Sequence, residues 1–140
     1  MTRVTAKTLI VEDDKFARRS LTDILRNRGF EVEAVEDGQQ ALQLLRNQSP
    51  PDVILLDMLL PKVDGWRFLQ EFDRLNVRPK PWIIITTGSP GLGREWAADH
   101  GCAGFLTKPI DEEELFDEIQ RCLNKTVEAN LTEDSRPDPL

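Results

Sequence analysis

The stretch Val53-Ile54-Leu55-Leu56-Asp57 decides the fold, because four apolar residues run directly into one carboxylate. A continuous apolar run of this length is typical of a strand buried on both faces, as in a parallel sheet. Aspartate is a poor strand residue and is costly to bury, so Asp57 should end the strand, where ligands bind in open parallel sheets. Taken alone, Asp57 is more simply explained as the cap of the following turn. The rest of the chain decides between these explanations.

Composition limits the classes of protein that the chain can belong to. A length of 140 residues fits one domain with a real core. The net charge of −7 and the pI near 4.8 argue against direct binding to nucleic acid or to an anionic membrane. No apolar run approaches the ~20 residues of a membrane span, and residues 1–7 lack the apolar core of a signal peptide. We therefore expect a cytoplasmic protein.

The cysteines and the histidine offer little catalytic or metal-binding chemistry. Cys102 and Cys122 have no metal-binding spacing and are expected to be buried free thiols, with one disulfide as the alternative. His100 is the single histidine, which excludes a histidine-based metal site and gives a Ser/His or Cys/His pair only weak support. We expect His100 to be a solvated residue at the end of a helix.

Hydrophobic periodicity predicts a strand followed by a helix, five times over. The expected strands are 7–11, 31–35, 53–57, 82–87 and 103–107. The expected helices are 15–28, one that starts at Asp37-Gly38 and ends before Pro50, 66–75, 93–100, and a last one that starts at Asp111. Strands that alternate with crossover helices form a parallel sheet with helices on both faces, so the fold class is α/β.

Two segments depart from this regularity. The fourth helix begins with Pro90-Gly91-Leu92-Gly93, which predicts that it is short and mobile. From Asn124 onward the helical pattern is lost and the chain is polar and acidic. We therefore expect a domain over residues 1–123 and a flexible acidic tail, or the start of a linker, over residues 124–140.

Chemically active side chains end or follow the predicted strands. The first strand is followed by Glu12-Asp13, the third ends in Asp57, the fourth ends in Thr87, and the fifth is followed by Lys108. Each of these residues alone has an ordinary explanation as a cap, a turn residue, a strand residue or a solvated lysine. Parallel strands end at the same edge of a sheet, however, so these residues should meet in one crevice.

This set of residues suits phosphoryl transfer to a carboxylate. Three neighbouring carboxylates repel one another unless a cation neutralises them, and oxygen ligands favour a hard ion such as Mg²⁺. Glu12 and Asp13 would hold that ion, directly or through water, while Asp57 acts as the nucleophile. Lys108 would supply a positive charge and Thr87 a hydroxyl donor to the transferring group.

These motifs, in this order, resemble the receiver domain of two-component response regulators. The matching segments are Leu9 to Asp14, Asp57 with Pro61 and Asp64-Gly65, Ile85 to Gly88, and Phe105 to Pro109, within about residues 7 to 123. The resemblance implies a flavodoxin-like (βα)5 fold, which is a doubly wound parallel sheet of five strands in the order 2-1-3-4-5.

The resemblance also implies how the acidic site would work. Asp57 would accept a phosphoryl group from a phosphohistidine of a histidine kinase or a histidine phosphotransfer protein. Glu12, Asp13 and Asp57 would bind Mg²⁺ together with the backbone carbonyl of Leu59. Lys108 would contact the phosphoryl group and would precede a cis-prolyl bond.

A second set of implied roles concerns signal output. Thr87 and Phe105 would be switch residues that move when Asp57 is phosphorylated. Their movement would reshape the surface made by the fourth helix, the fifth strand and the fifth helix, to which an unidentified downstream protein would bind.

Some positions differ from the common receiver pattern. Leu59 is apolar and Ser89 is small, at flanking positions that tend to set how fast water reaches the phosphoryl group, so the sequence does not specify the phosphoryl lifetime. Trp66 takes the place of a smaller apolar residue after Asp64-Gly65, and we expect it to add to the packing of the core.

Two alternatives share part of this chemistry. A haloacid-dehalogenase-type phosphatase also forms an aspartyl phosphate, but it needs a second Asp where this chain has Leu59, and it needs room for a cap domain. We therefore expect no turnover enzyme, beyond phosphorylation and slow dephosphorylation of Asp57 itself. The other alternative is a degenerate receiver that serves only as a protein-interaction module, against which intact Asp13, Asp57, Thr87 and Lys108 argue. The sequence contains no recognisable output domain, which fits either a stand-alone receiver or the receiver piece of a longer protein.

Overall fold

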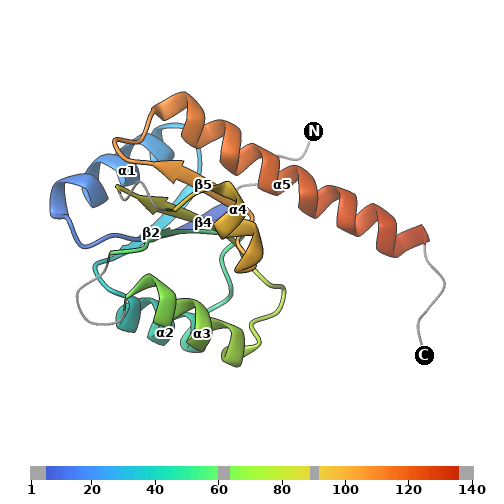
Figure 1. The fold of residues 1–140 in the computed structure, drawn as a ribbon. Helices are drawn as coiled ribbons and strands as arrows, with labels where there is room; N and C mark the ends of the chain where they lie inside the picture. The colour runs from blue at the N-terminus through green and yellow to red at the C-terminus, as the bar shows by residue number, and fades with distance from the viewer. Residues whose placement is uncertain (1–5, 60–63, 89–91, 136–140) are drawn as a thin grey trace.

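The computed structural model describes residues 6–59, 64–88 and 92–135, with side chains up to Val127 in the last segment. Its centre is a parallel sheet in the order β2-β1-β3-β4-β5 (Figure 1). The strands are β1 (Lys7–Val11), β2 (Glu31–Val35), β3 (Val53–Asp57), β4 (Trp82–Thr87) and β5 (Gly104–Thr107). The predicted fold class and the strand order implied by the resemblance are both confirmed.

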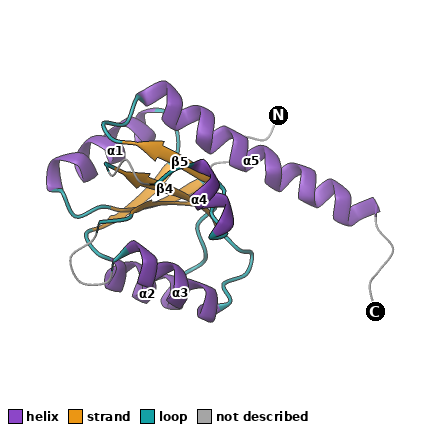
Figure 2. Cartoon of the chain, in the orientation of Figure 1, coloured by secondary structure: helices purple, strands orange, loops and turns teal. Residues whose placement is uncertain are grey.

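Helices cover both faces of the sheet (Figure 2). They are α1 (Lys15–Asn27), α2 (Gly38–Asn47), α3 (Gly65–Leu75), α4 (Arg94–Asp99) and α5 (Glu112–Ser135). One hydrophobic core lies between the sheet and α2, α3 and α4, and a second lies between the sheet and α1 and α5.

Strand β3 lies between these two cores, and all five of its residues are buried. Ile54 and Leu56 pack in the core beneath α2, α3 and α4, while Val53 and Leu55 pack in the core beneath α1 and α5. Burying one aliphatic side chain of this size contributes about 1.5–3 kcal/mol, so a shift in register would be costly. The apolar run therefore fixes the position of Asp57 at the end of the strand.

Aspartates begin the helices that follow β1, β2 and β3. Asp14, Asp37 and Asp64 are the N-caps of α1, α2 and α3, and each side chain accepts a backbone N–H of the first turn. The loop between β3 and α3 also needs a glycine. A Cβ at Gly65 would lie 2.7 Å from the Cα of Met58, so only glycine lets the start of α3 approach the end of β3 this closely.

Helix α5 is longer than the sequence pattern predicts. The apolar pattern ends at Leu123, but the backbone stays helical to Ser135, and the last turns project away from the sheet (Figure 1). Residues 124–135 contain neither glycine nor proline, so nothing stops the helix where the segment leaves the core and its apolar pattern ends. The predicted boundary between residues 123 and 124 thus falls inside a continuous helix.

Three further expectations concern single residues or short segments. Helix α4 is short, as predicted, with six residues. Its entry includes residues 89–91, which lie outside the described residues, so its mobility stays a prediction. Cys102 and Cys122 are buried free thiols, as predicted. Burial raises the pKa of Cys102 to about 11, so this thiol is protonated at neutral pH.

The expectation for Trp66 was wrong, and the one for His100 was right about its place at a helix end but wrong about its exposure to solvent, since His100 is half-buried. Trp66 does not join the core but is 46 % exposed, because the start of α3 directs it toward the end of α4. His100 lies at the C-terminal cap of α4, but its ring packs against Trp96 and Trp66, with centroid distances of 4.0 and 4.7 Å. In the part of the chain that the structure describes, no helix combines the length and apolar character needed to cross a membrane.

Candidate functional site

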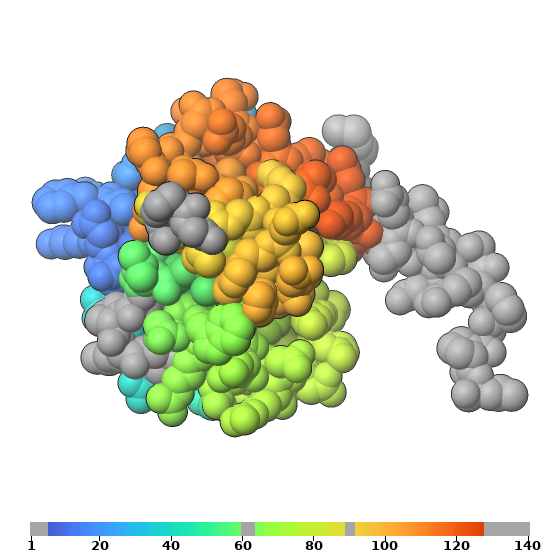
Figure 3. Space-filling view, viewed as in Figure 1, coloured from blue at the N-terminus to red at the C-terminus, as the bar shows by residue number. Residues whose placement is uncertain are grey.

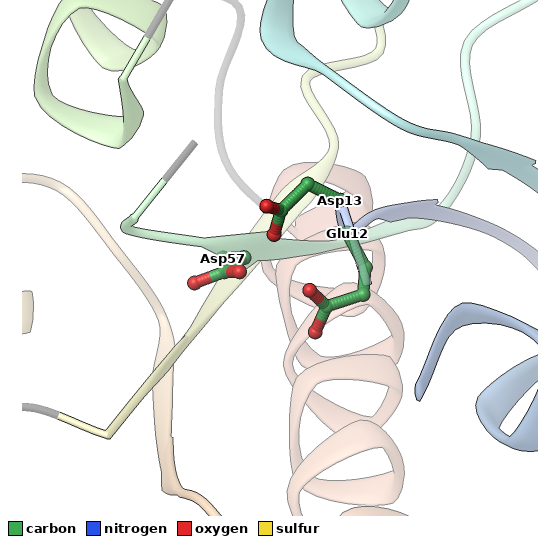
Figure 4. A group of neighbouring side chains, drawn as sticks. All are labelled: Glu12, Asp13 and Asp57. Carbon is green, nitrogen blue, oxygen red and sulfur yellow. The ribbon is translucent and has the colours of Figure 1, made fainter. Parts of the chain in front are cut away.

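The predicted acidic residues meet at the carboxyl edge of the sheet. Glu12 and Asp13 follow β1, and Asp57 ends the neighbouring strand β3 (Figure 4). Each of the three residues offers a carboxylate oxygen, and these oxygens all lie within 4.8 Å of one another. The arrangement follows from the parallel pairing of β1 with β3, which brings the two strand ends to the same edge.

The three carboxylates differ in their exposure to solvent. Glu12 is 2 % exposed and Asp57 is 4 % exposed, whereas Asp13 faces solvent. Two buried carboxylates this close to each other are unfavourable unless positive charge compensates them. The site therefore needs a cation, and the structure shows which one the chain itself supplies.

Lys108 is that cation. Its Nζ lies 2.7 Å from Glu12 Oε1 and 3.2 Å from Asp57 Oδ2, so one ammonium bridges both buried carboxylates. Partial burial by itself would lower the pKa of Lys108, but the hydrogen bond to Glu12 and the charges of Asp57 and Glu12 outweigh it and raise that pKa. Lys108 is therefore firmly protonated at neutral pH.

Backbone groups orient the two buried carboxylates. Asp57 Oδ1 accepts the N–H of Leu59 at 3.0 Å, which leaves Oδ2 facing Lys108. Glu12 Oε2 accepts the N–H of Asp14 at 3.2 Å, which leaves Oε1 facing the same ammonium. Each carboxylate is thus held by one backbone amide and one lysine, and neither is free to rotate away.

Arg18 supports the acidic pair and was missed by the sequence analysis. Its Nη1 donates to the carbonyl oxygens of Glu12 and Asp13 at 3.0 and 3.3 Å, and so fixes the backbone between β1 and α1. An arginine one turn into a helix looks in sequence like any solvated residue. Only the direction in which α1 leaves β1 brings its guanidinium back to these carbonyls.

The predicted switch residues lie on β4, which is next to β3, and on the edge strand β5. Thr87 is fully buried at the end of β4, and its carbonyl oxygen accepts the backbone N–H of Lys108 at 2.8 Å. The peptide bond from Lys108 to Pro109 is cis, as the resemblance implied. Phe105 is half-buried on β5, outside the acidic cluster. The structure thus joins Thr87 to the backbone of Lys108. Phe105 lies three residues before Lys108, within strand β5.

Glu118 on α5 organises the surroundings of Phe105 and was also missed. It accepts the Phe105 amide at 3.0 Å and pairs with Arg94 on α4 and Arg121 on α5 at 3.3 and 3.1 Å. Burial alone would raise the pKa of Glu118, but the hydrogen bonds from Arg121, Phe105 and Arg94 outweigh it and lower that pKa. Several acidic residues lie close together in this helix, and nothing in the sequence marks Glu118 among them.

The donor set fits a hard divalent cation. Glu12, Asp13 and Asp57 offer only carboxylate oxygens, the ligands that Mg²⁺ prefers, and no imidazole or thiolate lies among them. The backbone of Leu59 lies next to this group, since its N–H contacts Asp57. Coordination by the Leu59 carbonyl oxygen stays a prediction.

A match to a known family accompanies this geometry. Residues 8–120 match the model of the response regulator receiver domain, and the chain belongs to this family. Receiver domains of two-component systems are signalling modules that interact with kinases and downstream effectors, and they are not classical turnover enzymes. The haloacid-dehalogenase alternative is therefore excluded.

Individual relatives match most of this chain in sequence. PilH from Pseudomonas aeruginosa is 33 % identical over 119 residues, which are 84 % of this chain and 98 % of PilH. The response regulator MprA from Mycobacterium sp. is 32 % identical over 120 residues, which are 86 % of this chain and 51 % of MprA. The chain thus spans nearly all of one relative and about half the length of the other.

Solved structures agree with this assignment. A CheY-like receiver domain protein from Methanospirillum hungatei has a TM-score of 0.80 and 26 % identity, covering 90 % of this chain and 99 % of its own. The receiver domain of a sensor histidine kinase from Pseudomonas aeruginosa has a TM-score of 0.76 and 30 % identity, covering 86 % and 99 %. That structure carries a magnesium ion coordinated in its active site cleft.

Proposed function

We propose that this chain is a phosphorylatable receiver that accepts a phosphoryl group on Asp57 from a phosphohistidine of a histidine kinase or a histidine phosphotransfer protein. The observation that carries the proposal is the position of Asp57 Oδ2, 3.2 Å from Lys108 Nζ and within the carboxylate group of Glu12 and Asp13. A carboxylate with a fixed orientation, a neighbouring lysine and two further acids is equipped for phosphoryl transfer and for little else.

The reaction forms one bond and breaks one. An oxygen of the Asp57 carboxylate attacks phosphorus, the new O–P bond forms, and the P–N bond to the donor histidine breaks, so that the imidazole leaves with the electron pair of that bond. The buried β3 strand holds Asp57 still during this step, and the Leu59 amide fixes the orientation of its carboxylate. This pre-orientation reduces the entropic part of the barrier.

Positive charge at the site stabilises the transferring group. Mg²⁺, held by Glu12, Asp13, Asp57 and the Leu59 carbonyl, would neutralise charge on the phosphoryl oxygens. Lys108 already lies between Glu12 and Asp57, and it can exchange the Asp57 contact for a phosphoryl oxygen without moving its backbone, which is held by Thr87. Arg18 keeps the acidic pair in place by binding its backbone carbonyls.

The signal leaves through the surface of α4, β5 and α5. Phosphorylation of Asp57 draws the Thr87 hydroxyl toward the phosphoryl group, and Phe105 turns inward into the space that this movement opens. A hollow of about 380 Å³, lined by Arg94, Phe105 and Asp117 among others, lies on this surface. Movement of Phe105 therefore changes the shape of a surface that a downstream protein can contact.

The setting of this function follows from the same features. We infer that the chain works in the cytoplasm, where sensor kinases present their phosphohistidines, and that it binds neither nucleic acid nor membrane directly. The net charge of −7 supports both exclusions, since phosphate backbones and anionic lipids repel an acidic protein. The alternative of a degenerate receiver is less well supported, because the fold brings Asp13, Asp57 and Lys108 together at one site.

Phosphorylation by radiolabelled acetyl phosphate with Mg²⁺ tests the proposal. We expect acid-stable, hydroxylamine-labile label on the wild-type protein, no label on Asp57→Asn, and no label when EDTA removes the metal. Asp23→Asn is the matched control, because Asp23 is an exposed aspartate on α1 that lies outside the carboxylate group, and it should label normally. Wild-type protein that takes up no label, and binds no beryllofluoride with Mg²⁺, would overturn the proposal in favour of a degenerate receiver.

A further inference from the structure

An aromatic cluster on the surface of α3 and α4 has no part in phosphoryl transfer. Trp66 lies in the first turn of α3, Trp96 lies in α4, and His100 caps the end of α4. The Trp66 ring lies 5.7 Å from the Trp96 ring and 4.7 Å from the His100 ring, as measured between centroids. These helices meet on the face turned toward the viewer in Figure 3. Trp66 nevertheless remains 46 % exposed, which is a large apolar area for one surface side chain.

A groove of about 320 Å³ lies beside this cluster. Phe72 and Ile83, each 3 % exposed, contribute its apolar lining, and Trp66 and His100 line it as well. This volume is at the lower end of the range for ligand sites and can hold one or two side chains of a bound peptide. The groove lies between α3 and the end of α4, separate from the hollow beside Phe105.

The charge around the groove favours a cationic occupant. Asp73 on α3 and Asp99 on α4 both line it. Lys80 also lines the groove, and it is paired with Asp73 at 3.8 Å, so the charges of these two largely cancel. The carboxylate of Asp99 makes no hydrogen bond or ion pair with any part of the chain that the structure describes. One unpaired carboxylate beside an exposed indole is therefore available to a cation.

Two half-buried aromatic rings, those of Phe116 and Trp82, have a cationic neighbour that the exposed Trp66 lacks. Arg28 lies 3.8 Å over the centroid of Phe116, and Lys125 lies 5.8 Å from the centroid of Trp82. Among the described residues, no cation occupies the corresponding position over Trp66. A cation over an exposed indole is attracted by the ring, and arginine combines this stacking with hydrogen bonds to a carboxylate.

We propose that the groove between α3 and α4 binds an arginine side chain of a partner protein, whose guanidinium stacks on Trp66 and pairs with Asp99. The apolar lining beside Phe72 and Ile83 takes the aliphatic part of the arginine or a neighbouring apolar residue of the same segment. The net charge of −7 draws such a basic segment toward the chain. This second docking surface does not depend on phosphorylation of Asp57, and it leaves the hollow beside Phe105 accessible to another partner.

The indole N–H signals of the three tryptophans test this proposal in ¹H–¹⁵N spectra at physiological salt. The probe is a short capped peptide with two arginines, and its control is the same peptide with neutral citrulline at both positions. We expect the arginine peptide to shift the signals of Trp66 and Trp96, and the citrulline peptide to leave them unchanged. Trp82 serves as an internal reference, because it packs in the opposite core, where its Nε1 donates to Thr126.

Two variants make the test specific. Asp99→Asn should weaken peptide binding about fivefold, as expected for the loss of one exposed ion pair of about 1 kcal/mol, while Asp23→Asn should not change it. Asp57→Asn should bind the peptide like the wild type, which separates this site from the phosphorylation site. Equal shifts with citrulline, equal shifts of Trp82, or unchanged binding by Asp99→Asn would overturn the proposal. Shifts of Trp66 that depend on protein concentration alone would instead identify a second copy of the chain as the occupant.

Discussion

The amide N–H of Phe105 donates to Glu118 Oε2 at 3.0 Å, so a carboxylate on α5 binds the backbone of the predicted switch residue. Strand β5 is an edge strand, and among the residues that the structure describes no strand pairs with its outer backbone groups. Arg121 covers a second group at this edge, since its Nη2 donates to the carbonyl of Ala103 at 2.6 Å. Unpaired edges invite pairing with other chains, and α5 blocks that pairing here with charged side chains. The same contacts hold the Phe105 backbone in place while leaving its side chain to move.

Glu118→Gln should destabilise the protein by about 1–2 kcal/mol at neutral pH, because the half-exposed guanidinium groups of Arg94 and Arg121 lose a charged partner. The pKa of Glu118 is lowered by folding, so its stabilisation is present above the ordinary value of 4.5 and is lost as pH falls below it. Urea unfolding from pH 7 to pH 3 should therefore show a difference between wild type and variant that shrinks as the pH falls. Glu114→Gln, an exposed residue of the same helix, should cost less than about 0.5 kcal/mol. A difference that stays constant with pH would contradict this account.

Gly104→Ala should also destabilise the protein, by about 1–3 kcal/mol. A Cβ at Gly104 would lie 2.6 Å from Glu118 Oε2 and 3.0 Å from Ile84 Cγ1, so Glu118 has to leave its place beside Phe105. Gly93→Ala is the matched control, since a Cβ there meets nothing within 4 Å. Urea unfolding should show a smaller effect of Gly104→Ala in a Glu118→Ala background, because the shortened side chain no longer collides with the new Cβ. Additive effects would instead assign the cost to Ile84.

Lys108→Met should separate metal binding from phosphorylation. Removing the ammonium leaves Glu12 and Asp57 without the cation that now bridges them, so Mg²⁺ should bind several-fold more tightly in calorimetric titrations. Phosphorylation by acetyl phosphate should nevertheless fall at least about tenfold, since the positive charge for the phosphoryl oxygens is lost. Because the pKa of Lys108 is raised above its ordinary value of 10.5, the ammonium stays charged up to at least that pH. Phosphorylation of the wild type should therefore show no decline due to Lys108 between pH 6 and pH 9. Lys80→Met, which removes a surface lysine paired with Asp73, should leave both properties unchanged. Weaker Mg²⁺ binding by Lys108→Met would show that Lys108 organises the site rather than competing with the metal.

The acidic site could be predicted from the sequence because the prediction depends on few assumptions. Buried apolar runs such as Val53 to Leu56 define strands, parallel strands end at one edge, and Asp57, Glu12 and Lys108 follow from their places at the strand ends. The predicted bounds of β1, β3 and β4 coincide with the structure for the same reason, and those of the less buried β2 were predicted from its alternating pattern. The pattern of apolar residues shows which side chains are buried, and these strands lie within the sheet along their whole length.

Residues away from the sheet could not be predicted in this way. Trp66 looks like a core residue in sequence, but its place depends on how α3 begins relative to α4, which no local pattern encodes. Glu118 and Arg18 act through backbone groups outside their own helices, and residues of the same charge lie next to them in the sequence. The length of α5 was underestimated because an exposed helix has no apolar stripe to reveal it.

The extension of α5 gives the last prediction. Trp82 Nε1 donates to Thr126 Oγ1 at 2.5 Å, and Lys125 lies near the same ring, so residues beyond Leu123 cover the start of β4. Thr126→Val, which keeps the shape of the side chain but removes the acceptor, should shift the Trp82 indole N–H signal and cost about 1 kcal/mol in urea unfolding. Removal of residues 124–140 should cost at least as much, because the Lys125 contact is lost as well. Phosphorylation of Asp57 should survive both changes, since Trp82 begins β4 whereas Thr87, beside the phosphorylation site, ends it. If the truncated protein keeps its full stability, residues 124–140 do not stabilise the domain, which then ends near Leu123. If phosphorylation is lost, these residues support the acidic site from the opposite end of the sheet.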